Sequence, residues 1–561
     1  MTVTGSELIA RALRLEGIET VFALAGDHTL PLMDRMARDG FRFIDTRHEQ
    51  AAVDMANAYG RITGTPGVTM FTTPGHANAI PGLTLAHHME SPLVNISGCA
   101  DQDRLGQGAS QEIDQVGMAA PVTKGSWFVS DPYRIPEFIA RAFRTALAGG
   151  RGPVHLTIPT DVQQAEVEEK DVRFYTPEEY RPAGRVQGDP ARVRDAIDLL
   201  NRAKRPFVVV GNGAHSAEQA DLKRLVEITG IPLFTEMAAR GVVPDSHPLC
   251  FGLADGRANS VALSLKEADA VLLLGKKVDF LIAFGGPPAF DPDVSIIQVD
   301  SSYEQIGLSR GVDVGILGDP GAVVKQLADE AEGRDWAEHP MLEDLRSRQA
   351  DLERDLEGRT AASGIHTMDV HKALRRVVGE NDALVFEGCD FAFYGAPYHP
   401  SQKARRWFTN GTLGMIGWGV PFGIGAKVAL PDSKVVVLTG DGSFGFNAME
   451  LDTAVRHNIP VVVVIGNDSV WGIDYHQQVQ LFGNAVATEL SPATRYDKMA
   501  EALGAHGEFV QSAAEIPAAL ERAFAADRPA VVNVRTEPSP SPLTEWIIEQ
   551  KGRQGGVRRD S

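Results

Sequence analysis

Two polar segments in the last third of the chain have the residue types needed to hold a divalent cation and a phosphate group. Gly440-Asp441-Gly442-Ser443 follows the apolar run at 434–439, and Asn467-Asp468 follows the apolar run at 460–466. Glycines let the backbone approach a phosphate closely, and Mg2+ prefers carboxylate and carbonyl oxygens. Alone, the first segment is also a common turn. The second segment makes a diphosphate and magnesium site, where two strand ends meet, the better interpretation.

A second polar segment, near the N-terminus, contains a candidate proton-transferring carboxylate. Glu49 lies in Asp45-Thr46-Arg47-His48-Glu49, at the end of an expected strand and the start of an expected helix. A glutamate in a first helical turn also complements the helix dipole, which is the structural alternative.

Two histidines and two glutamines are further candidates for a substrate pocket in this part of the chain. His28 follows the first strand, His76 lies in the segment 73–79, and Gln111 and Gln115 lie in the segment 111–115. Imidazoles transfer protons near neutral pH, so we expect His28 and His76 to act on substrate. The alternative for each is a hydrogen-bonded loop residue. For His87 and His88 we favour a structural role.

Short β-branched runs that end in turn residues must position these groups. Ten of them read as buried parallel strands: 20–26, 67–72, 92–98, 154–158, 206–211, 270–275, 294–300, 434–440, 460–466 and 530–534. Helix-length segments follow them, including the amphipathic 6–16, 190–203 and 499–503. This alternation predicts an α/β fold with doubly wound parallel sheets, whose ligands sit beyond the carboxyl ends of the strands.

The length of 561 residues corresponds to about three or four domains. Segments 166–189 and 330–360 are rich in charge or proline and read as linkers or linking helices, so we predict three units, 1–185, 186–350 and 351–561. In the middle unit Gly211-Asn212-Gly213-Ala214-His215-Ser216 follows a strand but lacks the third glycine of a dinucleotide fingerprint.

The composition excludes several classes of protein. With 43% hydrophobic and 23% charged residues the chain is globular, and its net charge of −20 disfavours nucleic acid and anionic lipid. Three scattered cysteines predict no disulfide framework, the first residues do not resemble a signal peptide, and no segment is apolar enough for a membrane span. These features predict a cytoplasmic protein. From Pro538 onward the chain is Pro/Ser-rich and then basic, which indicates either a solvated, disordered end or a lid over a phosphate-bearing substrate.

Nearly the whole chain resembles the thiamine diphosphate (ThDP) enzymes of the acetolactate synthase, oxalyl-CoA decarboxylase, 2-hydroxyacyl-CoA lyase and benzaldehyde lyase group. The segment from Gly440 to Asp468 is similar to the family's diphosphate and magnesium motif, although Asp468 replaces its second asparagine. The resemblance implies that Asp441, Asp468 or Asn467, and the Val470 carbonyl bind Mg2+. It also implies that Glu49 protonates the aminopyrimidine of the cofactor. In 413–421, Ile416 would wedge beneath the cofactor and the Gly414 carbonyl would accept a hydrogen bond from it.

The resemblance also implies an arrangement of domains and subunits. The first domain would bind the pyrimidine and the third domain the diphosphate of a cofactor shared between two subunits. A homodimer would then be the minimal active unit, with a homotetramer expected. In relatives the middle domain binds ADP, binds FAD or is empty.

Several reactions fit these residues. Our leading interpretation is a 2-hydroxyacyl-CoA lyase that releases formyl-CoA and a ketone or aldehyde. The runner-up is a 2-oxo acid decarboxylase or acetolactate synthase-type carboligase, so the substrate is a small molecule, either an acyl-CoA or a 2-oxo acid. A catalytically silent ThDP-binding protein and a nicotinamide dehydrogenase built on 211–216 are the remaining alternatives.

Overall fold

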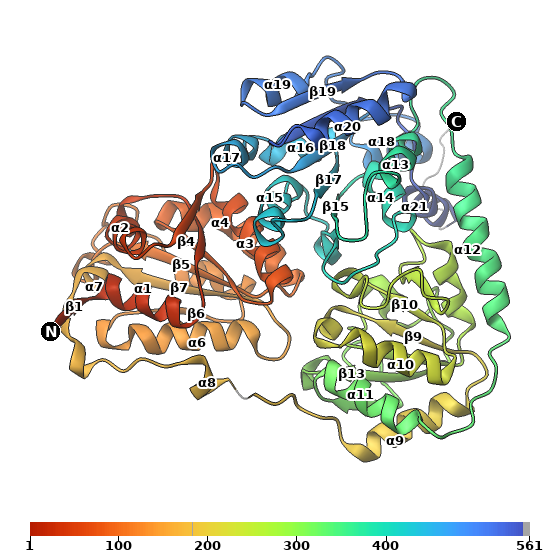
Figure 1. Cartoon of the computed structure of the whole chain (residues 1–561), viewed down its shortest axis with the longest axis horizontal. Coiled ribbons are helices and arrows are strands. Elements are labelled where there is room, and N and C mark those ends of the chain that lie inside the picture. Colours follow the sequence, from red (N-terminus) through yellow and green to blue (C-terminus); the bar gives the residue numbers. More distant parts are fainter. Residues whose placement is uncertain (182, 554–561) are drawn as a thin grey trace.

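Three six-stranded sheets, each with helices on both faces, form the chain (Figure 1), in a computed structural model that describes residues 1–181 and 183–553. The first sheet has the order β3 (Arg42–Asp45), β2 (Thr20–Ala23), β4 (Gly67–Phe71), β5 (Leu93–Cys99), β7 (Pro153–Pro159) and β6 (Ser126–Phe128). Its helices are α1 (Gly5–Leu15), α2 (Leu30–Arg38), α3 (Glu49–Thr63), α4 (Thr73–His88), α5 (Gln115–Ala119), α6 (Ile135–Leu147), α7 (Thr160–Gln164) and α8 (Pro177–Tyr180). A separate antiparallel pair joins β1 (Thr2–Thr4) to β8 (Glu166–Glu168).

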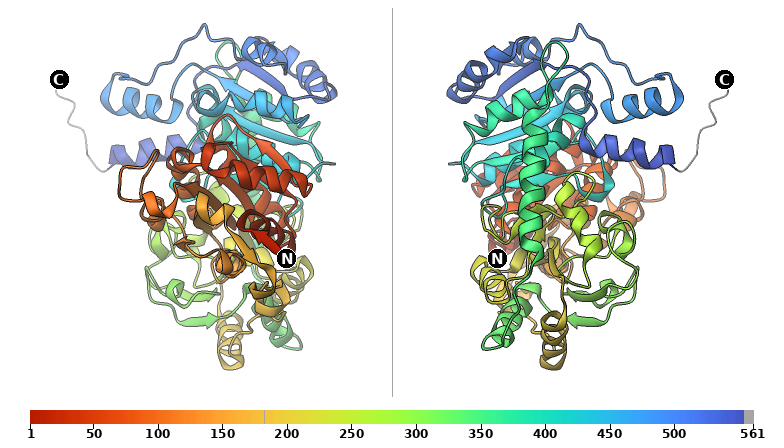
Figure 2. Two further views of the ribbon diagram at one scale, coloured as in Figure 1. Left: turned by 90° about the vertical axis from the view of Figure 1, so that its left-hand side faces the viewer. Right: turned by 90° about the vertical axis from the view of Figure 1, so that its right-hand side faces the viewer.

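The middle sheet has the order β11 (Cys250–Leu253), β10 (Leu233–Thr235), β9 (Pro206–Val210), β12 (Ala270–Leu274), β13 (Ser295–Asp300) and β14 (Val314–Leu317). Its helices are α9 (Pro190–Arg202), α10 (Gln219–Thr229) and α11 (Pro320–Ala331). The long helix α12 (Met341–Gly358) then runs along the outside of the molecule to the third domain (Figure 2).

The third sheet has the order β16 (Trp407–Thr409), β15 (Ala383–Glu387), β17 (Val435–Gly440), β18 (Val462–Asn467), β20 (Ala530–Arg535) and β19 (His506–Val510). Its helices are α13 (Thr367–Arg375), α14 (Asp390–Tyr398), α15 (Gly419–Ala429), α16 (Asp441–Asn447), α17 (Glu450–Arg456), α18 (Gly472–Phe482), α19 (Tyr496–Ala502), α20 (Ile516–Ala525) and α21 (Pro542–Arg553).

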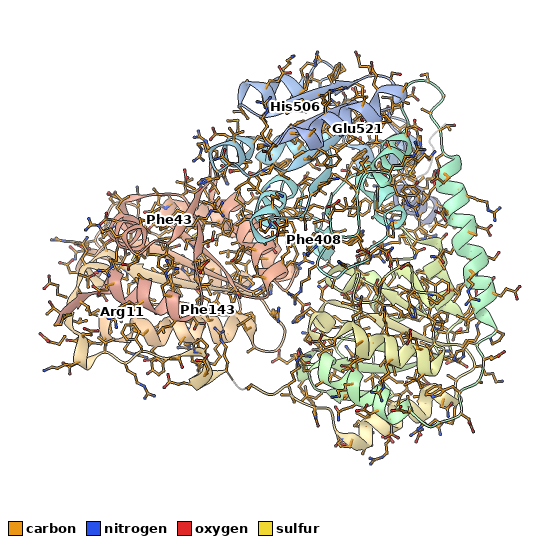
Figure 3. All side chains as sticks on the ribbon, in the orientation of Figure 1. Arg11, Phe43, Phe143, Phe408, His506 and Glu521 are labelled. Atoms are coloured by element: carbon orange, nitrogen blue, oxygen red, sulfur yellow. The ribbon has the colours of Figure 1, made fainter. Side chains whose placement is uncertain are left out.

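The pairs within the three large sheets are parallel. Parallel strands are covered on both faces, which is why their sequences are almost continuously apolar. Side chains fill the space between sheets and helices: Phe143 and Phe408 lie inside the first and third domains (Figure 3) and are 0% and 2% exposed. The doubly wound α/β fold predicted from the sequence is confirmed.

Each sheet changes its direction of winding at one point. The first sheet starts at β2, adds β3 on one side and then adds its remaining strands on the other side. The third sheet starts at β15, adds β16 on one side and continues in the same order as the first sheet. The changes fall between β2 and β4, β9 and β12, and β15 and β17. The crevice outside the carboxyl ends of the strands at such a point is the usual ligand site of open α/β sheets.

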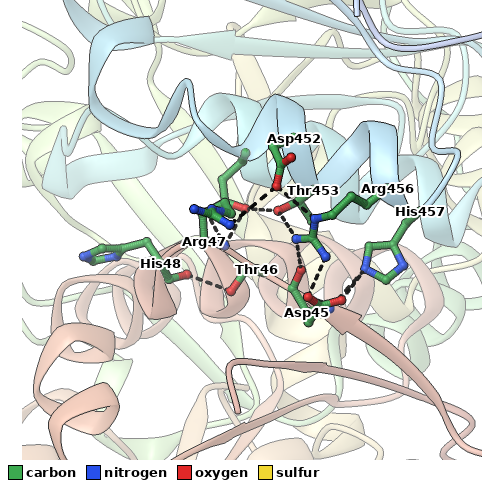
Figure 4. A network of polar contacts seen from close by, with 9 residues as sticks. Asp45, Thr46, Arg47, His48, Asp452, Thr453, Arg456 and His457 are labelled. Carbon is green, nitrogen blue, oxygen red and sulfur yellow. Dashed lines mark hydrogen bonds and ion pairs between the residues drawn. The ribbon is translucent and has the colours of Figure 1, made fainter. Parts of the chain in front are cut away.

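Contacts between β3, the start of α3 and α17 join the first domain to the third (Figure 4). Asp45 pairs with Arg456 at 2.5 Å and with His457 at 2.8 Å, and the backbone N–H of Arg47 donates to Glu450 at 3.0 Å. The residues just before Glu49 are therefore held against α17 of the same chain.

Other sequence predictions have mixed outcomes. The three cysteines are free, as predicted, and no helix in the described part of the chain is long and apolar enough to cross a lipid bilayer. The segment 330–360, interpreted as a linker or a linking helix, contains the linking helix α12.

The interpretation of a disordered end from Pro538 is wrong for 542–553: this stretch forms α21, because Leu543 and Thr544 are buried against the third domain. Arg558 and Arg559 lie outside the described residues.

Candidate functional site

A cavity of about 440 Å3 lies at the point where the third sheet changes direction. Gly440 ends β17, Asp441 begins α16, and Asp468 follows the last residue of β18. The predicted residues on the cavity wall are Gly414, Ile416, Gly440, Asp441, Gly442, Ser443, Asp468 and Val470. The structure thus brings together groups that the sequence separates by more than 50 positions.

Asp441 has the features of a cation ligand. Its side chain is 2% exposed, and neither carboxylate oxygen has a hydrogen-bond partner. Burial raises the pKa of Asp441 to about 6. For Asp468, burial and then the negative charge of Asp441 raise the pKa well above its ordinary value. A buried and a half-buried carboxylate facing one cavity are costly unless a cation lies between them.

The donor set fits Mg2+ better than a metal held by protein side chains alone. Within the described residues no three His, Cys, Asp or Glu side chains gather into a metal centre. Mg2+ uses one or two carboxylates and takes its other ligands from substrate phosphates and water. Asp441, Asp468 and the backbone at Val470 fit that pattern.

Asn467 is placed differently from its neighbour Asp468. Its amide oxygen accepts hydrogen bonds from Arg535 at 2.8 Å and Ser469 at 3.2 Å, and its amide nitrogen donates to Asn533 at 3.0 Å. Asn467 is absent from the cavity wall. Its side chain therefore stabilises the end of β18, while Asp468 faces the cavity.

The loop before α15 supplies a hydrophobic support on the opposite wall. Gly414 adopts a left-handed conformation, with φ of 68°. A Cβ on Gly388 would lie 2.7 Å from the Ile416 side chain. The Ile416 side chain can therefore lie this close to the end of β15 only because residue 388 is a glycine.

Asp390 is a cavity residue that the sequence interpretation missed. It begins α14 and lines the cavity. One of its carboxylate oxygens accepts from the Thr544 hydroxyl at 2.6 Å and from the Ser541 N–H at 2.8 Å, and the other has no partner. Leu543 lines the same cavity, so the C-terminal helix forms part of the site. The available signal was the polar turn after the apolar run 383–386.

Glu49 begins α3 and is 7% exposed. One carboxylate oxygen accepts a hydrogen bond from Asn78 at 3.1 Å. A Cβ on Gly75 would lie 2.7 Å from the other oxygen, so glycine at 75 gives the carboxylate its space. Glu49 is absent from the wall of the cavity at Asp441, as are all other described residues of the first domain.

The four remaining candidates form one hydrogen-bonded chain at the end of the first sheet. His28 is half-buried, and its Nδ1 lies 2.9 Å from the Thr72 hydroxyl, which donates to Gln111 at 3.3 Å. Burial lowers the pKa of His28, so its ring is neutral at pH 7. Gln115, which is 2% exposed, donates to the Thr73 hydroxyl at 2.9 Å.

His76 lies deeper than the sequence prediction placed it. Its ring is 0% exposed, with Nε2 3.1 Å from the Gln115 carbonyl and Nδ1 3.1 Å from the Asn95 amide. Burial lowers the pKa of His76 to about 4. This ring is neutral at pH 7 and positions Gln115 rather than facing solvent.

A second, narrow cleft lies between the three domains, where the middle sheet changes direction. Its wall includes Asn212, Gly213, His215, Lys277 and Asp300 from the middle domain, Arg61, Glu90 and Arg151 from the first domain, and Arg405 from the third. Glu90 is paired with Lys277 at 2.6 Å. The two terminal nitrogens of Arg61 are buried without a partner, and burial lowers its pKa to about 10. A buried guanidinium in this state is suited to pair with an anion.

Comparison with known proteins agrees with this geometry. The thiamine pyrophosphate enzyme N-terminal TPP-binding domain matches residues 3–118, the central domain 193–327 and the C-terminal TPP-binding domain 388–534. A probable acetolactate synthase of Mycobacterium bovis is 36% identical over 550 residues, covering 96% of both chains. A 2-hydroxyacyl-CoA lyase of Arabidopsis thaliana is 32% identical over 558 residues, covering 96% of both chains. Human 2-hydroxyacyl-CoA lyase 1 is 29% identical over 558 residues, covering 96% of this chain and 95% of its own. The chain belongs to the thiamine pyrophosphate enzymes, and is a thiamine diphosphate-dependent enzyme with the three domains of that family in order.

Proposed function

We propose that this enzyme is a Mg2+-dependent carbon–carbon lyase that cleaves 2-hydroxyacyl-CoA esters into formyl-CoA and a ketone or aldehyde. The observation that carries the proposal is the buried, unpartnered carboxylate of Asp441, directly after the end of β17. Relatives named 2-hydroxyacyl-CoA lyase support the reaction. Relatives named acetolactate synthase support the alternative, a 2-oxo acid decarboxylase or carboligase.

The protein's own groups would hold the cofactor and move protons. Bound ThDP supplies a nucleophilic carbon and an electron sink for breaking the bond beside a carbonyl. Glu49, oriented by Asn78, would hold a proton at the aminopyrimidine. His28, neutral and fixed by Thr72, would take the proton from the substrate 2-hydroxyl. Gln111 and Gln115 would orient the same end of the substrate, and His76 would support Gln115.

Incubation of the holoenzyme with short 2-hydroxyacyl-CoA esters tests the reaction. We expect formyl-CoA by mass spectrometry only when ThDP and Mg2+ are present. A parallel reaction with pyruvate is the control. Acetolactate or carbon dioxide from pyruvate, without formyl-CoA from the esters, would assign the enzyme to the 2-oxo acid branch instead.

Mg2+ would be held by Asp441, Asp468 and the Val470 carbonyl, with Asn467 supporting the strand end. Dialysis against EDTA is therefore expected to lower activity at least about tenfold, because two carboxylates would then face the phosphates without a cation. Returning Mg2+ should restore activity and cofactor retention, measured together by turnover and by ThDP content after gel filtration. Full activity in metal-free enzyme would contradict this site.

A homodimer is proposed as the minimal catalytic unit, with a homotetramer as the complete assembly. The cavity at Asp441 is lined by the middle and third domains, and Glu49 lies elsewhere in the same chain. A second copy would bring its Glu49 to this cavity.

The cleft between the domains is proposed as a nucleotide site that takes ADP, or the ADP part of FAD. Gly213 and Gly275 approach so closely that a Cβ on Gly213 would lie 3.0 Å from Gly275. Because neither residue has a side chain, phosphates could approach the backbone here. Arg61, Arg151 and Arg405 supply positive charge. Asp300, at the end of β13, would accept hydrogen bonds from ribose hydroxyls.

This site predicts a pH-dependent affinity. Burial raises the pKa of Asp300 to about 6, and burial lowers the pKa of His215 to about 4. Of these two groups, only Asp300 changes charge between pH 7 and pH 5. Because the ionised carboxylate is the acceptor, ADP should bind about tenfold more weakly at pH 5 than at pH 7 by isothermal titration calorimetry. The terminal phosphate of ADP, whose second pKa is also about 6, titrates with both proteins, so Asp300→Asn should reduce this dependence to the part that comes from ADP. An unchanged pH profile in that variant would rule out Asp300 as a source.

A further inference from the structure

The middle-domain end of the active-site cavity differs in character from the end that contains Asp441. Its middle-domain wall contains the apolar side chains of Met237, Leu253, Ala258, Phe280 and Leu281 beside the charged Glu236, Asp255 and Arg257, and the third domain adds Phe393, Ile473 and Leu543 to the same cavity. We propose that this apolar end, with Phe280 as its main contact, binds an uncharged substituent of about phenyl size on the substrate. Turnover of a substrate with such a substituent rests on the proposed function, whereas binding of the substituent at this end of the cavity does not.

Phe280 is held in place although its ring is 55% exposed. The Arg257 guanidinium lies 4.6 Å from the ring centre. Two hydrogen bonds to Asp255, at 2.8 and 2.7 Å, fix that guanidinium. A large apolar ring that is already fixed at a cavity rim is a typical ligand contact, because little conformational entropy is lost when a ligand buries it.

The backbone just after Phe280 is strained, in the segment whose first residues, Phe280 and Leu281, line the cavity. Ala283 and Phe284 both adopt the left-handed region, with φ of 47° and 54°. Residues other than glycine rarely take this conformation, and such strain gathers at functional sites. The Asp279 side chain accepts from the Leu281 N–H at 3.0 Å, and its carbonyl accepts from the Phe284 N–H at 2.8 Å.

Charges at this end are paired within the protein, which argues against an ionic substituent. Lys276 lies between Glu236 at 3.0 Å and Asp279 at 2.6 Å, so one positive charge is paired with two negative charges. Arg257 is paired with Asp255. The remaining negative charge would repel a carboxylate, and among the described residues the cations near this end, Arg257 and Lys276, are already paired.

Phe284 offers a matched control on the same loop. It is 56% exposed and its ring lies 6.3 Å from that of Phe280, yet it is absent from the cavity wall. Phe280→Ala and Phe284→Ala therefore remove the same side chain from adjacent places, only one of which faces the substrate.

The test compares mandelyl-CoA with lactoyl-CoA, which carry phenyl and methyl groups, on the holoenzyme. We expect Phe280→Ala to lower kcat/KM for mandelyl-CoA about tenfold while changing that for lactoyl-CoA less than about twofold. Phe284→Ala should leave the ratio unchanged. Equal losses for both substrates, or equal effects of both variants, would overturn the proposal. So would unchanged selectivity combined with a loss of oligomer, because a second copy would then be what covers Phe280.

A binding measurement separates this proposal from the reaction. Acetophenone and acetone are titrated into the holoenzyme while the fluorescence of tryptophan is followed, since Trp407 and Trp471 line the cavity. Acetophenone should bind at least about tenfold more weakly to Phe280→Ala than to the unaltered enzyme. If neither CoA ester turns over but this difference is seen, the proposed reaction fails and the apolar subsite stands. If the unaltered enzyme does not prefer acetophenone to acetone, the subsite is wrong.

Discussion

Glu49→Gln is expected to lower kcat by at least about 100-fold while ThDP still binds, because a positioned general acid or base contributes about that much or more. Glutamine keeps the size of the side chain and an oxygen that can accept the 3.1 Å hydrogen bond from Asn78. It cannot gain or lose the proton. Turnover and the ThDP content of the purified variant are measured on the same preparation, so that loss of chemistry is separated from loss of cofactor.

Two further variants serve as controls for the Glu49→Gln result. Glu166→Gln makes the same chemical change at an exposed position and should leave kcat unchanged. Asn78→Ala should lower kcat less than Glu49→Gln, because it disorders the carboxylate without removing it. Unchanged turnover in Glu49→Gln would contradict the proton transfer proposed here and would favour a protein in which ThDP serves another purpose.

The strands that carry the site could be predicted because parallel strands buried on both faces are continuously apolar. Residues 434–440 and 460–466 show this directly, and they form β17 and β18. The edge strands β6 and β16 have only three residues each, too few to show a pattern. The fold class was therefore predictable, whereas the edges of the sheets were not.

The side on which each site residue lies was harder to predict. Asn467 and Asp468 are adjacent, yet one is bonded within the third domain and the other faces the cavity, because successive residues leaving a strand point to opposite sides. The place of Asp390 soon after an apolar run was visible in the sequence, but its partners Ser541 and Thr544 were not, because they are about 150 positions away. His76 was found as a polar residue near a strand end, but its burial depends on Asn95 and Gln115 from other elements.

Mixing two inactive variants should restore activity if the site is shared between chains. Glu49→Gln and Asp441→Ala each remove one half of the machinery, so each homo-oligomer is expected to be inactive. In a dimer that contains one chain of each kind, one of the two sites combines the intact Glu49 with the intact Asp441. Random mixing makes half of the dimers mixed, so about a quarter of all sites should be intact.

The structural reason for this expectation is the separation of the two groups within one chain. The segment before Glu49 is tied to α17 by the pairs of Asp45 with Arg456 and His457, and no described residue of the first domain lines the cavity at Asp441. Co-expression with two different affinity tags isolates the mixed dimers, in which about half of the unaltered specific activity should return. Two differently tagged copies of Glu49→Gln are the control and should remain inactive. If the mixed dimers are equally inactive, Glu49 and Asp441 must act within the same chain, which would require the first domain to reorient toward the third.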